Sequence, residues 1–73
     1  MTTATPLRTL RLARALGTRT LASEAGVTQK TLLTTELGRR RPSLTTIRRL
    51  SAALGVAPLD VTEFRSVLLE AAR

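Results

Sequence analysis

Glycines and prolines divide this 73-residue chain into segments that leave room only for short structural elements. They stand at positions 17, 26, 38 and 55 (glycine) and at positions 6, 42 and 58 (proline). Between them, apolar residues recur every three to four positions, as on an amphipathic helix. No segment alternates apolar and polar residues as a half-buried strand does. We therefore predict an all-α domain of five short helices with short connections.

Capping residues mark where each helix is expected to begin. Threonine suits the position before a helix and proline suits the first helical position, so Thr5 and Pro6 predict the first start and Gly17 the first end. The remaining helices are predicted from Thr18 to Gly26, from Thr28 to Gly38, from Ser43 to Gly55, and from Pro58 onward. The corresponding organisation is a flexible tail at 1–4, a four-helix unit at 5–56 and a C-terminal helix at 57–73.

Composition limits both the core and the chemistry of the chain. It has no cysteine and no histidine, which excludes disulfides and a soft or borderline metal site, and Phe64 is the only aromatic residue of an otherwise aliphatic core. No apolar run approaches the roughly 20 residues that a membrane span needs, and no signal-peptide pattern is present. We expect a soluble cytoplasmic protein without a cofactor.

Charge is distributed unevenly along the chain. Residues 1–55 carry ten basic and two acidic side chains, a net charge of +8, whereas residues 56–73 carry two basic and three acidic ones, a net charge of −1. A GC-rich genome would favour arginine, but such a bias does not separate charge in this way. The segregation favours a polyanionic partner for the first 55 residues, with nucleic acid ahead of an anionic membrane surface.

The segment 28–38 has two unlike sides when it is built as a helix. With 100° between successive residues, one side of the helix carries Thr31, Leu32 and Thr35. The opposite side carries Gln29, Lys30, Leu33, Thr34 and Leu37. In a DNA major groove, Gln29 and Lys30 would hydrogen-bond base edges and Leu33 would pack on thymine methyl groups. Alternatively, Leu33 is an ordinary exposed leucine.

Several motifs occur in an order that is informative as a set. They are Leu7-x-x-Leu10-Arg11, Leu21-Ala22-x-x-Ala25-Gly26-Val27-Thr28, Glu36-x-Gly38-Arg39, and Pro42-Ser43-Leu44 leading to Ala53-Leu54-Gly55-Val56. Over about residues 7–56 the chain resembles the lambda-repressor/Cro-like, or Xre, family of helix-turn-helix DNA-binding domains. The resemblance implies a helix-turn-helix in the second and third helices and a recognition helix at 29–37, with Gln29, Lys30, Leu33 and Thr34 facing the bases.

The resemblance also implies contacts with the DNA backbone and one structural ion pair. The implied phosphate contacts are Thr18, Arg19, Thr28, Arg39, Arg40, Arg41 and Ser43. A solvated loop is the alternative for the three consecutive arginines. Arg11 and Glu36 match a pair that joins the first and third helices. Because no histidine, cysteine, tyrosine or nearby second carboxylate accompanies Glu36, we expect no enzymatic activity.

Two positions depart from the family pattern. Thr18 stands where a glutamine usually contacts a phosphate, and its shorter side chain weakens that expectation. Thr35 stands where the family usually buries a branched apolar residue, so its hydroxyl requires a partner, for which the helix backbone is available.

The sequence thus predicts a small sequence-specific regulator of transcription that binds double-stranded DNA. Phage repressors of the Cro kind, restriction-modification controllers and antitoxins all resemble it at this length. The alternatives are a protein-binding module and a basic membrane-surface binder. We further expect a homodimer on a pseudo-palindromic operator, joined through an apolar stripe of Val61, Phe64, Val67 and Leu68, unless that stripe completes the core of the monomer.

Overall fold

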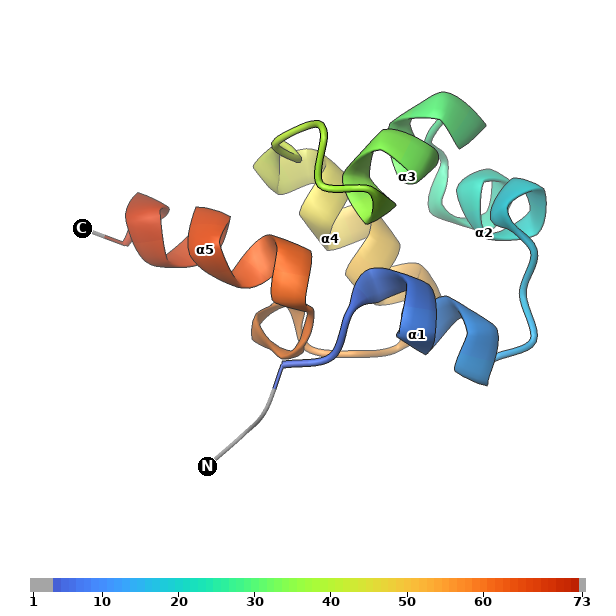
Figure 1. The fold of residues 1–73 in the computed structure, drawn as a ribbon, viewed down its shortest axis with the longest axis horizontal. Coiled ribbons are helices and arrows are strands. Elements are labelled where there is room, and N and C mark those ends of the chain that lie inside the picture. The colour runs from blue at the N-terminus through green and yellow to red at the C-terminus, as the bar shows by residue number, and fades with distance from the viewer. Residues whose placement is uncertain (1–3, 73) are drawn as a thin grey trace.

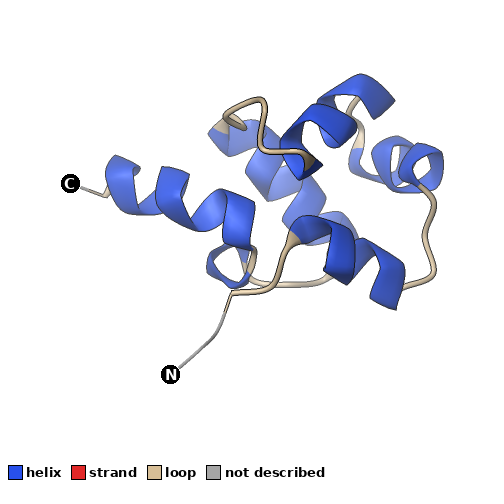
Figure 2. Ribbon diagram, in the orientation of Figure 1, coloured by secondary structure: helices blue, strands red, loops and turns tan. Residues whose placement is uncertain are grey.

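The computed structural model describes residues 4–72, and every regular element in this part of the chain is a helix (Figure 2). The elements are α1 (Leu7–Ala13), α2 (Thr18–Ala25), α3 (Gln29–Glu36), α4 (Leu44–Leu54), the 3-10 helix η1 (Pro58–Asp60) and α5 (Thr62–Ala71). The prediction of an all-α domain with five helices is confirmed.

The helices surround one apolar core to which all five α-helices contribute. The fully buried apolar side chains are Leu7, Leu21, Leu32, Leu50, Leu54, Val61 and Phe64, and Ile47 is 2% exposed. Helix α2 packs against both α3 and α4, while η1 packs between α4 and α5. As Figure 1 shows, the C-terminal half of α5 extends away from the other helices along the longest axis of the molecule.

The start of α1 differs from its prediction. The helix begins at Leu7, with Pro6 rather than Thr5 at the N-cap position. The backbone of Thr5 instead pairs with the segment before α5, since its N–H donates to Asp60 O (2.8 Å) and its C=O accepts from Thr62 N (3.0 Å). The Leu7 N–H donates to Glu63 Oε1 (2.8 Å), so a side chain of α5 caps this helix across the fold.

Ala4 is the one residue of the predicted tail that the structure describes. It is half-buried, and it precedes the paired residue Thr5. The rest of the predicted tail, residues 1–3, lies outside the described residues.

The connection from α1 to α2 also differs from the prediction. Helix α1 ends at Ala13 rather than at Gly17, and Ala15 has a positive φ (55°). Gly17 occupies the N-cap position of α2, so Thr18 is the first helical residue and not the cap. In this connection Arg11 Nη1 donates to Leu16 O (2.9 Å), a contact that stabilises its non-helical course.

The caps of α3 and α4 are those that the sequence predicts. Thr28 Oγ1 accepts from Thr31 N (3.1 Å), and Ser43 Oγ accepts from Thr46 N (3.2 Å). Helix α4 ends at Gly55 with a φ of 68°, a left-handed conformation that costs glycine little.

The C-terminal helix corrects two expectations. Pro58 opens the 3-10 helix η1, and α5 itself begins at Thr62. Within the single chain Val61 and Phe64 are fully buried and Val67 is 8% exposed, so these residues complete the monomer core and are not available as a dimer surface. Of the predicted stripe, Leu68 alone is only partly buried against the core.

A buried hydroxyl in α4 lacks a partner. Ser51 is 3% exposed, and among residues 4–72 its Oγ meets no hydrogen-bonding group. A hydroxyl that is buried without a partner loses its hydration and gains nothing in exchange.

We predict that Ser51→Ala raises the free energy of unfolding by about 1 kcal/mol, because it removes this desolvated group. Urea denaturation followed by circular dichroism measures the change. Ser66→Ala is the matched control, since Ser66 is exposed in the middle of α5 and reports only the better helix propensity of alanine. Equal gains for the two variants would show that the buried hydroxyl carries no penalty.

Candidate nucleic-acid interface

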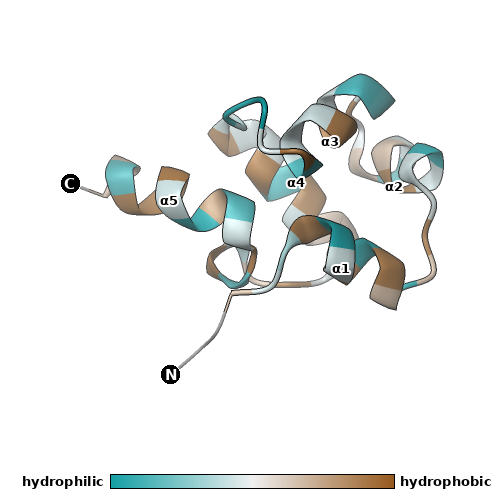
Figure 3. Cartoon of the chain, in the orientation of Figure 1, coloured by the Kyte–Doolittle hydropathy of each residue, from teal (hydrophilic) through white to brown (hydrophobic). Residues whose placement is uncertain are grey.

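Helix α3 separates an exposed side from a buried one as its sequence predicts. Leu32 and Thr35 are fully buried against the core, whereas Gln29 and Lys30 are exposed and Leu33 is 39% exposed. Figure 3 shows hydrophilic residues at the first turn of this helix and in the loop that follows it. Three of the four candidate base-contacting side chains therefore share a solvent-facing side of one helix.

Two threonine hydroxyls of α3 are satisfied by the backbone of the same helix. Thr35 Oγ1 donates to Thr31 O at 2.7 Å, which is the partner that this buried position requires. Thr34 is half-buried, and its Oγ1 lies 2.9 Å from Lys30 O and 3.1 Å from Thr31 O. Because Thr34 donates its proton internally, it offers an outside partner only its methyl group and oxygen lone pairs.

Arg11 and Glu36 form the ion pair that the resemblance implies. Arg11 Nε lies 2.8 Å from Glu36 Oε2, and Arg11 Nη2 lies 3.1 Å from Glu36 Oε1, a bidentate geometry. Their side chains are 9% and 6% exposed. Since the same guanidinium also donates to Leu16 O, one side chain ties α3 to α1 and to the loop before α2.

A hydrogen bond joins the starts of α2 and α3. Gln29 Nε2 donates to Thr18 Oγ1 at 2.8 Å, between two residues that were expected to face DNA separately. The first turn of α2 has no side-chain cap among the described residues. Helix-start N–H groups without an internal acceptor favour an anion, so this end of α2 offers a backbone site beside Thr18.

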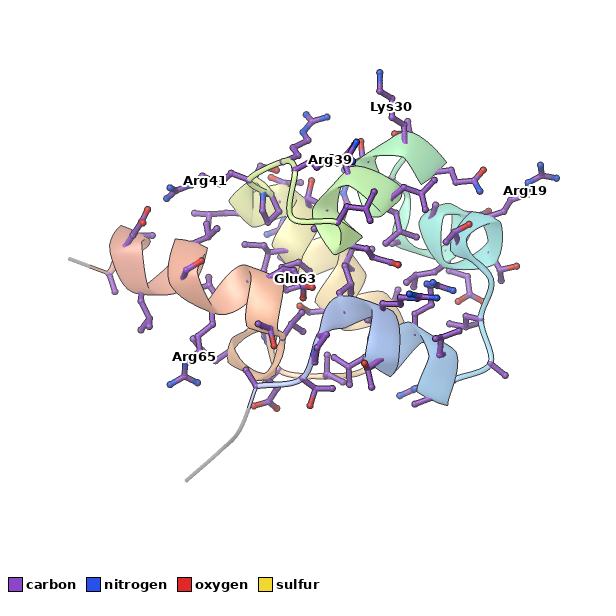
Figure 4. All side chains as sticks on the ribbon, in the orientation of Figure 1. Arg19, Lys30, Arg39, Arg41, Glu63 and Arg65 are labelled. Carbon is purple, nitrogen blue, oxygen red and sulfur yellow. The ribbon has the colours of Figure 1, made fainter. Side chains whose placement is uncertain are left out.

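Basic side chains extend from the same part of the molecule. In Figure 4, Arg19, Lys30 and Arg39 project outward from α2, α3 and the following loop, while Arg65 points away from the opposite side. Arg40 is also exposed in that loop.

Besides Thr18, three of the expected phosphate contacts are engaged within the protein. Arg41 forms an ion pair with Glu70 of α5, so its guanidinium is already paired in the free domain. The oxygens of Thr28 and Ser43 cap α3 and α4, and their hydroxyl protons are directed to Thr31 Oγ1 and Thr46 Oγ1.

Sequence reasoning missed three side chains that hold this region in place. Arg49 Nη1 of α4 donates to Gly26 O at 3.0 Å, at the turn between α2 and α3. Glu63 caps α1, and Glu70 pairs with Arg41. The sequence contained a signal for Glu63 and Glu70. They are seven residues apart, so they lie on one side of a helix, and both belong to the less basic end of the chain.

The described residues show neither a metal site nor a membrane span. Among residues 4–72, no three His, Cys, Asp or Glu side chains gather as metal ligands would. None of the helices in this range has the length and apolar character that crossing a membrane requires.

We predict that Glu36→Leu lowers the free energy of unfolding by about 3 kcal/mol, because it leaves the Arg11 guanidinium buried without its partner. The double variant Arg11→Met/Glu36→Leu should recover most of this loss, since apolar side chains of similar size can replace a buried pair. Urea denaturation of both variants measures the effect. A small loss in the single variant, or an additive loss in the double one, would contradict the proposed coupling.

Comparison with known proteins agrees with this geometry. A family model described as a helix-turn-helix domain matches residues 4–64, a stretch that includes α1 to α4 and the start of α5. No curated protein and no solved structure matches the chain. The chain therefore belongs to the helix-turn-helix domain family, a family of DNA-binding domains, in agreement with its lambda-repressor/Cro-like motifs.

Proposed function

We propose that this protein is a sequence-specific transcription regulator that binds double-stranded DNA with α3 in the major groove. The observation that carries the proposal is the exposed side of α3, where Gln29, Lys30 and Leu33 face solvent while the opposite side is buried. A helix of this kind fits the major groove, whose base edges offer a distinct pattern for each base pair.

The contact between Gln29 and Thr18 supports a role for both residues. An amide group has two N–H donors, so Gln29 Nε2 can donate to Thr18 and to an adenine N7 together, while its Oε1 accepts from adenine N6. Because Thr18 Oγ1 already accepts from Gln29, its own proton is directed elsewhere and suits a phosphate oxygen. The hydrogen bond thus orients a base-reading group before DNA arrives.

Arg19, Arg39 and Arg40 supply phosphate contacts in this proposal. All three are exposed, and guanidinium groups match phosphate oxygens well. Such contacts strengthen binding to every sequence and fix the position of the recognition helix, whereas the residues of α3 discriminate between bases.

We predict that Gln29→Ala and Arg40→Ala weaken DNA binding in different ways. Gln29→Ala should cost about 1–3 kcal/mol on a duplex selected from random sequences and little on a mixed-sequence duplex. Arg40→Ala should weaken both similarly and lower the salt dependence, the slope of log K against log salt, by about one unit. Fluorescence anisotropy over a salt series measures both effects.

Arg65→Ala is the matched control, because it removes the same charge from the opposite side of the molecule (Figure 4). Binding by this variant should equal that of the wild type. If selection enriches no sequence, or if Gln29→Ala weakens both duplexes equally, α3 is not reading bases.

The proposal includes a homodimer joined through an exposed apolar cleft rather than through the buried stripe. The cleft lies between η1 and α5 and is lined by Ala57, Pro58, Leu59, Leu68, Leu69 and Ala72. Leu59 and Leu69 are 47% and 50% exposed. A second copy of this chain is the occupant we propose, since the weakly charged C-terminal part lets two copies approach without the repulsion of the basic part.

We predict that Leu69→Glu separates the dimer and weakens operator binding, because it places a charge in the apolar contact. Circular dichroism should show unchanged helix content, and analytical ultracentrifugation reports the mass. Leu12→Glu is the control, since Leu12 is a similarly exposed leucine (55%) on α1. A wild-type protein that sediments as a monomer at about 100 μM and binds its operator as one copy would contradict the dimer.

A further inference from the structure

The loop between α3 and α4 contains three consecutive arginines that differ in their surroundings. Arg39 projects outward near α3, whereas Arg41 points toward the side of α5 (Figure 4). Arg41 Nη2 forms an ion pair with Glu70 Oε2 of α5. One arginine of the loop is thus neutralised by a carboxylate in the free domain.

Arg41 also lines a cleft between the loop and α5. The cleft has a volume of about 320 Å³, and its lining includes Gly38, Arg40 and Arg41 from the loop and Glu63 and Ser66 from α5. The loop is therefore not closely packed against α5 at this point. The two paired side chains are 61% and 53% exposed, so Arg41 has room to reorient.

Other contacts already hold α5 on the domain. Phe64 and Val67 are buried in the core, and Glu63 accepts the Leu7 N–H. The pair between Arg41 and Glu70 lies beyond these anchors, near the exposed end of the helix. An exposed ion pair adds little to stability, so this one is free to be exchanged for a better partner.

A DNA phosphate is a better partner for Arg41 than Glu70 is. A guanidinium binds phosphate oxygens through two charge-assisted hydrogen bonds, and a phosphate contact also releases a counterion from the duplex. While Glu70 holds Arg41, the pair carries no net charge and contributes little to binding a polyanion.

We propose that Glu70 competes with DNA phosphate for Arg41 and thereby lowers the affinity of the domain for duplexes of any sequence. The carboxylate occupies the guanidinium in the free protein and yields it when DNA binds. This inference rests on the proposed DNA-binding function. It makes α5 a determinant of DNA affinity through a residue that faces neither the core nor the bases.

Glu70→Gln tests the proposal on a mixed-sequence duplex, because the effect does not depend on base recognition. Affinity at low salt should rise about two- to fivefold, the range expected when an exposed ion pair no longer has to be broken. The salt dependence should change by much less than one unit, because Arg41 contacts a phosphate in the complexes of both proteins. In an Arg41→Ala background the substitution should have little effect on affinity.

Glu24→Gln is the matched control, since it removes one negative charge from an exposed position on α2 that forms no ion pair within residues 4–72. An equal gain for Glu24→Gln, or a gain for Glu70→Gln that persists with Arg41→Ala, would show a general charge effect and overturn the proposal. Unchanged or weaker binding by Glu70→Gln would overturn it as well. If the wild type binds no duplex at all, the proposed function fails together with this inference.

Discussion

The orientation of α3 depends on one buried ion pair. Arg11 contacts Glu36 through two nitrogens and also donates to Leu16 O, so a single guanidinium connects α1, the loop before α2 and the end of α3. The planar donor group of arginine accepts little change of angle in such an arrangement. One side of α3 must stay exposed for a ligand, so apolar packing cannot hold the helix on that side. The ion pair restrains the helix instead.

The exposed side of α3 and the stability of the domain impose opposite demands on the sequence. Leu33 is 39% exposed on this eight-residue helix, and Leu37, at its C-cap, is 65% exposed. Burial of Leu32 and Thr35 provides most of the apolar contact that holds the helix on the domain. The hydroxyl of Thr35 is tolerated because Thr31 O accepts it within the helix. A weakly anchored helix that is followed by a basic loop is suited to contacts with a polyanion.

The C-terminal helix connects distant parts of the domain. It completes the core with Phe64, caps α1 with Glu63 and reaches the loop after α3 with Glu70. Much of the acidic charge of the chain is thus used to neutralise or cap specific groups near the basic part. The basic part and the less basic C-terminal part are separate in the sequence, but in the folded domain their charged groups contact each other.

The sequence by itself determined the features that depend on near neighbours. The all-α class, the caps at Thr28 and Ser43 and the two sides of α3 follow from residues within one or two turns of each other, and the motifs were enough to anticipate the partnership of Arg11 with Glu36. Tertiary structure decided the rest. Helix α5 determines how α1 starts and how Arg41 pairs, although it lies far from both in the sequence. The expected dimer stripe is buried because α5 packs against the other helices. Short-range hydrogen bonds are encoded by residue spacing, whereas these contacts exist only once helices distant in sequence have packed together.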